Sequence, residues 1–422
     1  MFNKTLILIL AIGIIIRLFL SAITFHPDIT AFDLGGQLVA KGNVLNLYDY
    51  ISKLPSTSPL LKNYPPDFLI YPPAIYLYQG LFAAMFNNFF DPGFLMSVLV
   101  EVPKTFNTWT LSWHLVFLKL PYLLFDIPIA FLLAKLFESK REKILAFTFW
   151  IFNPVNLYAT YMMGQFDIIP TFFVILSLYF LRRSQMKEKN IIFALIALGV
   201  GAAFKIYPLF LIIPLAFIGR TFWDKIKYLL IGVLPYFLFI LPFIFSHGFR
   251  SSALVAGQTL KSFYAQIPIS GGESIILFPF ILIFFYLYIY LNNKLLNNFE
   301  NVWKIDFIIL ILFFIFTHYH PQWFLWLTPF LIIALIKSNN KIVLPFVLSL
   351  ISFFGLLFFF DSSLTIGIFS PIISSLYQSP TAWEIFRINI DTSFARSILQ
   401  TLFVSCGAIF IYFFFPKVDE NG

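Results

Sequence analysis

Four short polar segments interrupt the apolar stretches of this 422-residue sequence, and each contains side chains able to do chemistry. They read HPDITAFD at 26–33, GQFD at 164–167, FKIYP at 204–208 and HYHPQ at 318–322. An aspartate can take a proton from a hydroxyl group, and lysine or histidine can bind a phosphate. Polar side chains at membrane depth are costly and usually line a water-filled cavity or a site. The four segments therefore predict one reaction centre at a membrane surface.

The composition predicts that lipid surrounds most of this chain. Sixty per cent of the residues are apolar, 11% are charged and the mean hydropathy is +0.87. No soluble domain of this size hides so much apolar surface, so we expect one integral membrane domain over residues 1–422. The net charge of +8 comes from short Lys/Arg clusters, which suit membrane topology better than nucleic-acid binding. The lone Cys406 excludes a disulfide framework and a thiolate metal site.

The apolar segments predict an all-α polytopic membrane protein with about 12–14 transmembrane helices. They fall at about 5–24, 71–90, 113–134, 144–163, 168–181, 190–204, 207–219, 228–245, 275–291, 305–319, 323–336, 342–360 and 397–415. The first of them reads as a retained signal anchor, because it lacks a small-residue cleavage site.

The basic connections set the expected orientation. Placing the Lys/Arg-rich connections inside puts both termini in the cytoplasm and all four polar segments outside. A long first external loop then covers 25–112, with re-entrant or interfacial helices, and another external loop covers 361–396. We expect a multi-pass cell-membrane protein whose site faces the extracytoplasmic side.

The first two polar segments supply carboxylates. Asp28 follows the first span closely, where it serves either as a helix N-cap or as a general base. Asp33 is the second candidate base. Gln165 and Asp167 stand at the mouth of a short apolar segment, and a carboxylate there needs a cation or a substrate hydroxyl as partner. No metal ligands are assigned from this pattern, and no cofactor is indicated; a divalent cation is left as an alternative.

The other two segments supply cationic and imidazole groups. Lys205 either snorkels to the interface or delivers an ammonium group to the outer cavity, where a phosphate would suit it. His318 and His320, with Gln322 beside them, are candidates for phosphate binding, whereas an aromatic belt accounts for the tryptophans that follow. Tyr71 begins a YPP sequence that suits a rigid wall, with core packing as the alternative.

Ionisable residues elsewhere have plainer interpretations. Lys119 and Asp126 share one predicted span and are expected to pair with other helices, and Arg17 is expected to snorkel. Four further cations lie in predicted external loops, where they are either solvated or available to an anionic lipid headgroup. These four are Arg250, Lys261, Arg387 and Arg396.

Five motifs in order resemble a known family over residues 5 to about 335. They are the run from Asp28 to Tyr48, YPPAIYLYQGLF at 71–82, GQFDIIPTFFVILSLYFL at 164–181, FKIYPLFLIIP at 204–214 and HPQWFLWLTPFL at 320–331. Together they resemble the GT-C superfamily of membrane glycosyltransferases, in particular the polyprenol-phosphate-mannose-dependent group that includes the second mannosyltransferase of GPI assembly.

The resemblance implies a GT-C-type helical bundle, a polyprenyl-phosphate sugar donor and a lipid-linked or glycan acceptor outside the cytoplasm. It implies that Asp28, in preference to Asp33, is the catalytic base. The resemblance also implies that Asp167 corresponds to the aspartate of a Gly-Gln-x-Asp element. It implies that Lys205 corresponds to the lysine of a Lys-x-x-Pro element. The sequence departs from the family at His320, where His-Pro-Gln-Trp replaces His-Glu-Arg-Tyr, so the way this chain holds the donor phosphate is in question.

The expected activity is an inverting transfer of a sugar, which the resemblance implies is mannose, in glycolipid or glycan assembly. A lipid-linked sugar transporter or flippase is one alternative, although such folds usually show two related halves. A polysaccharide polymerase or ligase is the other, although the predicted external loop at 246–274 has only Arg250 and Lys261 to hold a diphosphate.

Overall fold

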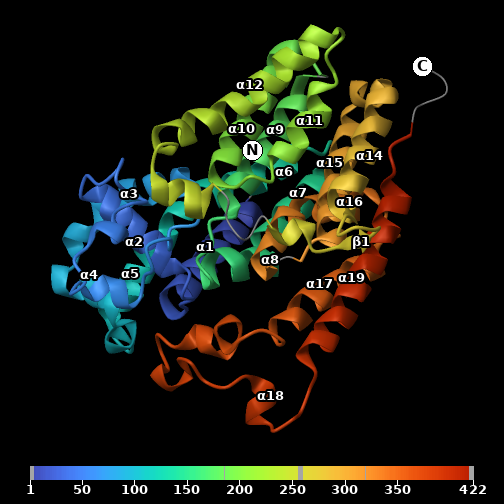
Figure 1. The fold of residues 1–422 in the computed structure, drawn as a ribbon. Coiled ribbons are helices and arrows are strands. Elements are labelled where there is room, and N and C mark those ends of the chain that lie inside the picture. The colour runs from blue at the N-terminus through green and yellow to red at the C-terminus, as the bar shows by residue number, and fades with distance from the viewer. Residues whose placement is uncertain (1–3, 185, 255–259, 319, 418–422) are drawn as a thin grey trace.

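The computed structural model describes residues 4–184, 186–254, 260–318 and 320–417. It is built almost entirely of helices, which confirms the all-α prediction (Figure 1). The principal helices are α1 (Lys4–Ile23), α2 (Ile29–Ala40), α3 (Pro73–Phe86), α4 (Pro92–Val100), α5 (Trp109–Lys119), α6 (Leu123–Lys135), α7 (Lys140–Ile151), α8 (Pro154–Asn156), α9 (Ile168–Ser184), α10 (Glu188–Phe204), α11 (Leu209–Ala216), α12 (Phe222–Ile240), α14 (Leu277–Leu291), α15 (Phe299–Phe316), α16 (Thr328–Lys337), α17 (Val343–Leu357), α18 (Ala382–Ile385) and α19 (Thr392–Phe414). Strands β1 (Gln266–Pro268) and β2 (Ser274–Ile276) form one antiparallel pair.

Four helical segments within the described residues are long and apolar enough to cross a membrane. They are Lys4–Ile23, Trp109–Lys135, Phe222–Phe243 and Thr392–Phe414. Shorter apolar helices, such as α14 and α17, accompany them. The protein is therefore a membrane protein, and the predicted number of about 12–14 crossings stays a prediction.

The predicted first external loop forms a layer of short helices beside the bundle, at the blue end of the chain in Figure 1. Helix α3 has 14 residues, about 21 Å, which falls short of the roughly 30 Å of hydrocarbon. It packs closely on α2 because Gly80 has no side chain. A Cβ at that position would lie 2.3 Å from Cγ1 of Val39. This packing agrees with the interfacial or re-entrant interpretation, which itself stays a prediction.

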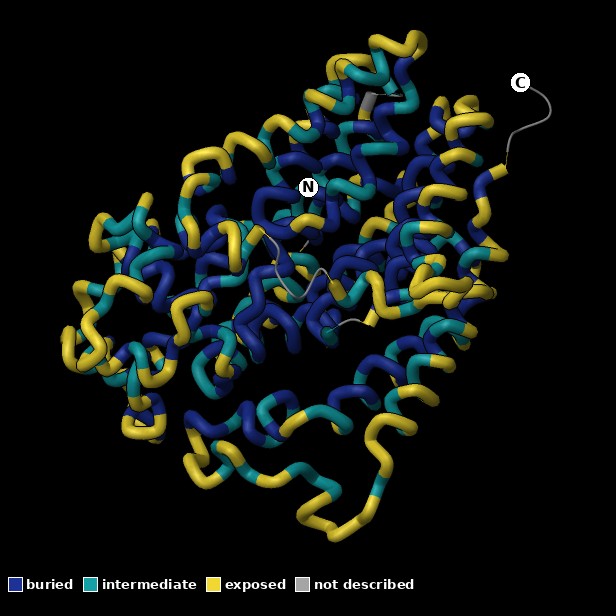
Figure 2. The backbone as a smooth tube through the Cα atoms, in the orientation of Figure 1, coloured by how far each residue is buried: buried dark blue, intermediate teal, exposed yellow. Residues whose placement is uncertain are grey.

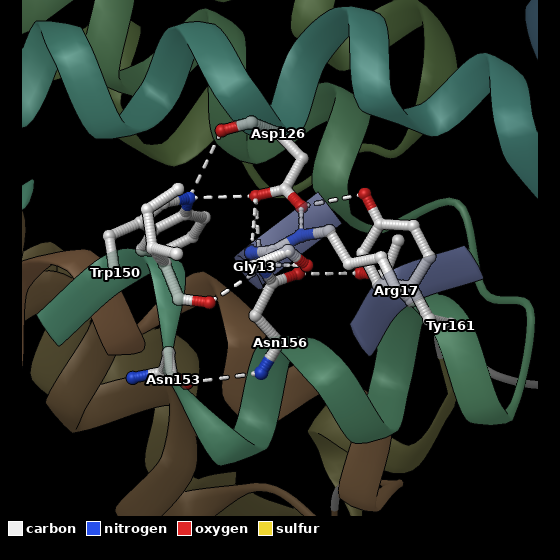
Figure 3. Close-up of polar contacts among 9 residues, drawn as sticks. Gly13, Arg17, Asp126, Trp150, Asn153, Asn156 and Tyr161 are labelled. Carbon is white, nitrogen blue, oxygen red and sulfur yellow. Dashed lines mark hydrogen bonds and ion pairs between the residues drawn. The ribbon is translucent and has the colours of Figure 1, made fainter. Parts of the chain in front are cut away.

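A buried polar cluster joins α1 to α6 and to the segment that precedes GQFD (Figure 3). Arg17 Nε donates to Asp126 Oδ2 at 2.5 Å, and the Tyr161 hydroxyl donates to the same oxygen at 2.6 Å. Trp150 Nε1 and Asn156 Nδ2 each donate to Asp126 Oδ1 at 2.8 Å. The expectation that Arg17 snorkels is therefore wrong, since its side chain is fully buried and paired. The expected pairing of Asp126 with other helices is confirmed.

Lys119 binds carbonyl groups at the C-terminal end of α1. Its Nζ donates to the Thr24 carbonyl at 2.7 Å and to the Ser21 carbonyl at 3.2 Å. The last carbonyls of a helix lack partners within the helix, and a cation there also meets the negative end of the helix dipole. Lys119 thus fixes the point at which the chain leaves α1 for the first polar segment.

The C-terminal quarter supplies a cover for this end of the bundle. The connection between α17 and α19 lies at the end of the molecule opposite the C-terminus (Figure 1). The Phe25 amide donates to the Ile368 carbonyl at 2.8 Å, and the Tyr158 hydroxyl donates to the Leu364 carbonyl at 2.6 Å. Much of α18 and its neighbours is exposed, whereas Ile368 and the chain it covers are buried (Figure 2).

Candidate active site

The carboxylate of Asp28 is held by an amide from a distant part of the chain. Asp28 is the N-cap of α2, yet its side chain accepts no hydrogen bond from that helix. Instead, Asp28 Oδ2 accepts from Gln165 Nε2 at 2.7 Å. The side chain of Asp28 is 39% exposed, whereas Gln165 is fully buried. The geometry therefore favours an accessible, oriented base over a helix cap.

The local backbone before Gln165 positions its side chain. A π-helix spans Leu157–Met162, and single π-turns are frequent at functional sites. Gly164 then takes a φ of +75°, a conformation that favours glycine. A Cβ at Gly164 would lie 2.7 Å from Cδ1 of Ile29, so the close approach of the two segments also needs glycine. This turn places Gln165 against Asp28.

Lys205 points inward to Asp167 instead of snorkelling. Its Nζ lies 2.7 Å from Asp167 Oδ1, and the Asp167 carboxylate is fully buried. Trp326 Nε1 donates to the same oxygen at 2.5 Å. Four aromatic rings have centroids within 5.2–6.0 Å of the Lys205 ammonium group, close enough for cation–π attraction. These rings belong to Tyr71, Phe166, Trp323 and Trp326.

A cavity of about 590 Å³ brings together residues from most of the predicted external connections. Its polar side chains include Asp28, Lys205, His320 and Gln322, and Tyr71 contributes to its wall. The remaining wall is mainly apolar and comes from α11, α12, α14 and α15. That wall includes Phe210, Tyr236, Phe278, Leu282, Ile283 and Phe313. The cavity thus has one polar end and one long apolar side.

A second cavity, of about 360 Å³, also borders Asp28. It is lined by parts of the first predicted external loop, including Thr30, Asn63 and Tyr64. Asp28 and Tyr71 line both cavities. Asp28, with a partly exposed side chain, therefore belongs to the walls of both cavities.

His320 stands where a long connection meets the large cavity. His320 Nε2 lies 2.5 Å from Nζ of Lys261, which belongs to the connection between α12 and α14. Burial, with the nearby charges of Lys261 and Lys205, lowers the pKa of His320 to about 4. His318 is exposed and is not among the residues lining either cavity, although its ring lies 6.3 Å from that of His320. Residue 319 of this segment lies outside the described residues.

Asp33 lies away from both cavities. Its Oδ2 is 2.8 Å from His114 Nε2, and its Oδ1 accepts from Gln37 Nε2 at 2.9 Å. The side chains of Asp33 and His114 are both buried. Because this carboxylate has its partners and no opening to either cavity, the geometry gives it a structural place between α2 and α5.

Asp167 also lies behind the cavity instead of on its wall. It is fully buried and is not among the lining residues, and its Oδ2 has no hydrogen-bond partner among the described residues. Its contacts with the site pass through Lys205 and Trp326, which both line the large cavity. The Oε1 atom of the neighbouring Gln165 likewise has no partner within the described part of the chain.

Three features of this site were not predicted from the sequence. Trp323 and Trp326 are buried around Lys205 and do not form an aromatic belt, because stacking with Tyr207 and with each other holds them inside. Lys261 reaches His320 across 59 positions of the chain. Asp361, from the C-terminal region that no motif covered, lines the large cavity.

Within the part of the chain that the structure describes, no three His, Cys, Asp or Glu residues are grouped as a metal ion would need.

Comparison with known proteins gives a partial sequence match. No protein-family model matches the sequence. Over 150 residues the sequence is 27% identical to GPI mannosyltransferase 1 of Candida albicans (strain SC5314 / ATCC MYA-2876), covering 34% of this chain and 35% of that protein. The match therefore spans about a third of the length of this curated relative. It agrees with the resemblance to membrane mannosyltransferases, through the first GPI enzyme instead of the second.

A solved structure also aligns with most of this chain. The crystal structure of ArnT from Cupriavidus metallidurans in the apo state aligns with 97% of this chain and 77% of its own, with a TM-score of 0.41 and 12% sequence identity.

Proposed function

We propose that this protein is a membrane glycosyltransferase of the GT-C type. It moves a sugar, in the first instance mannose, from a polyprenyl-phosphate donor to a lipid-linked or glycan acceptor on the extracytoplasmic side. The partial sequence similarity to a GPI mannosyltransferase supports the sugar and the reaction class. The ordered motifs from Asp28 to His320 support the family.

The observation that carries this proposal is that Asp28 lines both cavities. The large cavity has a long apolar wall, suited to a prenyl chain, and a polar end, suited to a sugar phosphate. The smaller cavity offers Asn63, Tyr64 and Thr30, groups that hydrogen-bond to hydroxyls. A transferase that joins two substrates needs one base that reaches both of them.

Asp28 is the proposed general base. In an inverting transfer the acceptor hydroxyl attacks the anomeric carbon from the face opposite the phosphate, and the base takes the hydroxyl proton as the bond forms. The C–O bond to the phosphate breaks, and its electron pair leaves with the phosphate oxygen. Gln165 holds the carboxylate in place for this step.

The leaving group determines what else the site must provide. A phosphate leaves as a weakly basic anion, so it needs positive charge more than a strong general acid, unlike the alkoxide in glycoside hydrolysis. Lys205 supplies positive potential beside Asp28, and the buried carboxylate of Asp167 fixes its position. Gln322, Tyr71 and the tryptophans form the wall against which the sugar would rest.

Donor specificity tests the proposal. The purified chain in lipid nanodiscs is incubated with a short glycolipid acceptor and radiolabelled mannose on either a prenyl monophosphate or a prenyl diphosphate. We expect label in the acceptor only from the monophosphate donor. Transfer from the diphosphate donor alone would indicate a polymerase or ligase. Movement of intact donor across a liposome membrane without transfer would indicate a flippase, and either result would overturn the proposal.

A further inference from the structure

The ammonium group of Lys205 already has a counter-ion. Asp167 lies 2.7 Å away, and four aromatic rings have centroids 5.2–6.0 Å from the Lys205 Nζ. Lys205 lines the large cavity, but its charge is already shared with the buried Asp167 carboxylate. Moving Lys205 away from Asp167 toward a phosphate would leave a buried carboxylate without its cation, which is costly.

Lys261 is differently placed. It begins a short 3₁₀ turn, Lys261–Phe263. The two residues that follow it line the large cavity, whereas Lys261 itself is not among the lining residues and meets the wall through His320. Among the described residues, no carboxylate lies within ion-pair distance of its ammonium group. Its contact is with the imidazole of His320, a residue of the cavity wall. An ammonium group can donate three hydrogen bonds, and only one is directed at His320.

His320 accepts that hydrogen bond in its neutral form. Burial and the two lysines on either side keep its pKa low, so Nε2 is an acceptor and the ring proton is on Nδ1. The pair therefore carries one positive charge and holds more than one N–H donor. This is the donor set that a phosphate monoester requires.

Neighbouring charges make the rim around this pair electropositive. Lys261 and Arg396 both lower the pKa of His318, which places an arginine near the same rim. Asp361 is an acidic residue of this wall besides Asp28, and its carboxylate accepts from the backbone N–H of Ser363 at 2.9 Å. Asp28 also acts on His320 electrostatically, so the base lies close to the pair.

We infer that Lys261 and His320 form the subsite for the phosphate group of the prenyl-phosphate donor, at the polar end of the large cavity. The inference rests on the proposed function. It assigns to the connection between α12 and α14 a part in donor binding that no motif indicated. The sugar would then lie between this subsite and Asp28, with the prenyl chain along α11, α12 and α14.

Equilibrium binding to the full chain in nanodiscs tests the subsite. Three probes are compared: a prenyl monophosphate, the matching uncharged prenol and inorganic phosphate. We expect the wild type to bind the monophosphate at least about tenfold more tightly than the prenol, a difference of about 1.4 kcal/mol. Lys261→Ala and His320→Ala should bind both lipids within about twofold of each other. Lys261→Arg should retain most of the preference, because it keeps the charge.

The control variant is Lys53→Ala, in another predicted loop on the same external side. Lys53 is exposed, bonds to Asn46 and lines neither cavity, so its loss should leave the preference unchanged. Unchanged prenol binding by Lys261→Ala shows that the variant is folded. If inorganic phosphate competes in a way that depends on Lys261, the subsite takes free phosphate as well as the lipid, and the assignment of the pair stands.

The outcomes separate this inference from the proposed function. If the wild type prefers the monophosphate through Lys261 but transfers no sugar, the subsite stands and the proposed reaction falls. If Lys261→Ala keeps the full preference for the monophosphate while the wild type transfers sugar, the reaction stands and the subsite is overturned. Absence of any preference in the wild type also overturns the subsite.

Discussion

Gln165 and Asp28, 137 positions apart in the sequence, are joined by a hydrogen bond of 2.7 Å from Gln165 Nε2 to Asp28 Oδ2. Gln165 is fixed from behind, since its backbone N–H donates to the Ala159 carbonyl at 2.9 Å and its side chain is buried. The rigid partner is the amide and the accessible partner is the carboxylate. This is the arrangement expected where a base must keep one orientation toward two substrates.

Replacing Gln165 should therefore impair catalysis without removing the base. Gln165→Leu is expected to lower kcat by about ten- to a hundredfold, because small misplacements of a reacting group have effects of that size. Gln165→Glu places a second carboxylate beside Asp28, and a like charge raises the pKa of a carboxyl group. The acid limb of the pH–rate profile should then move to higher pH. A wild-type profile for Gln165→Glu would contradict the contact between the two side chains.

The pair of Lys205 and Asp167 should behave as one buried unit. Lys205→Met leaves the Asp167 carboxylate buried and unpaired, which is expected to cost about 3–5 kcal/mol of unfolding free energy. Lys205→Met combined with Asp167→Leu should recover most of that loss. Reversible unfolding in detergent, followed by tryptophan fluorescence, measures both. Equal destabilisation in the single and double variants would show that the two residues are not coupled.

The buried cluster around Asp126 should likewise stabilise the helical bundle. Arg17→Met should destabilise the protein by about 3–5 kcal/mol, because four donors converge on Asp126 and the arginine carries the compensating charge. Gln165 should lose its fixed position as well, since Tyr161 and Asn156 precede it closely. Thermal unfolding and residual transfer activity are the two readouts. An Arg17→Met protein as stable as the wild type would agree with a snorkelling arginine instead.

The neutral state of His320 gives a pH dependence of stability. In the unfolded chain its pKa is near 6.5, and in the folded chain it is about 4. Between these values the unfolded chain binds the additional proton, so the unfolding free energy should fall as the pH is lowered from about 6.5 to about 4. His320→Gln should lose that component, whereas the exposed His247→Gln should keep it. Parallel curves for the wild type and His320→Gln would contradict the burial of a neutral imidazole.

Much of the fold was predictable because helices follow local apolar composition. The spans at α1, α12 and α19 correspond to apolar segments of the sequence. The polar segments were predictable as a group because polar side chains at membrane depth are costly and usually line a cavity or a site. The cavity then brings Asp28, Lys205 and His320 together, as those segments indicated.

The pairings within the site were not predictable, because each one joins residues that only tertiary packing makes neighbours. Asp33 finds His114, 81 positions away, in a buried pair that lines neither cavity. Lys205 finds Asp167, and this contact changes a candidate phosphate ligand into a paired charge. Sequence patterns describe residue types over short stretches of the chain. They carry no information about contacts between residues that are far apart in the sequence.

Sugar transfer by an Asp28→Asn variant measures the central claim most directly. The substitution keeps the size of the side chain and a hydrogen-bonding oxygen for Gln165, and it removes the proton acceptor. Asp28→Asn should unfold at the wild-type temperature, bind prenyl monophosphate as the wild type does, and turn over at least about a hundredfold more slowly, the lower range for loss of a general base. Asp33→Asn, matched in chemistry but placed outside both cavities, should keep the substrate-dependent acid limb of the pH–rate profile. Wild-type turnover by folded Asp28→Asn protein would contradict the account.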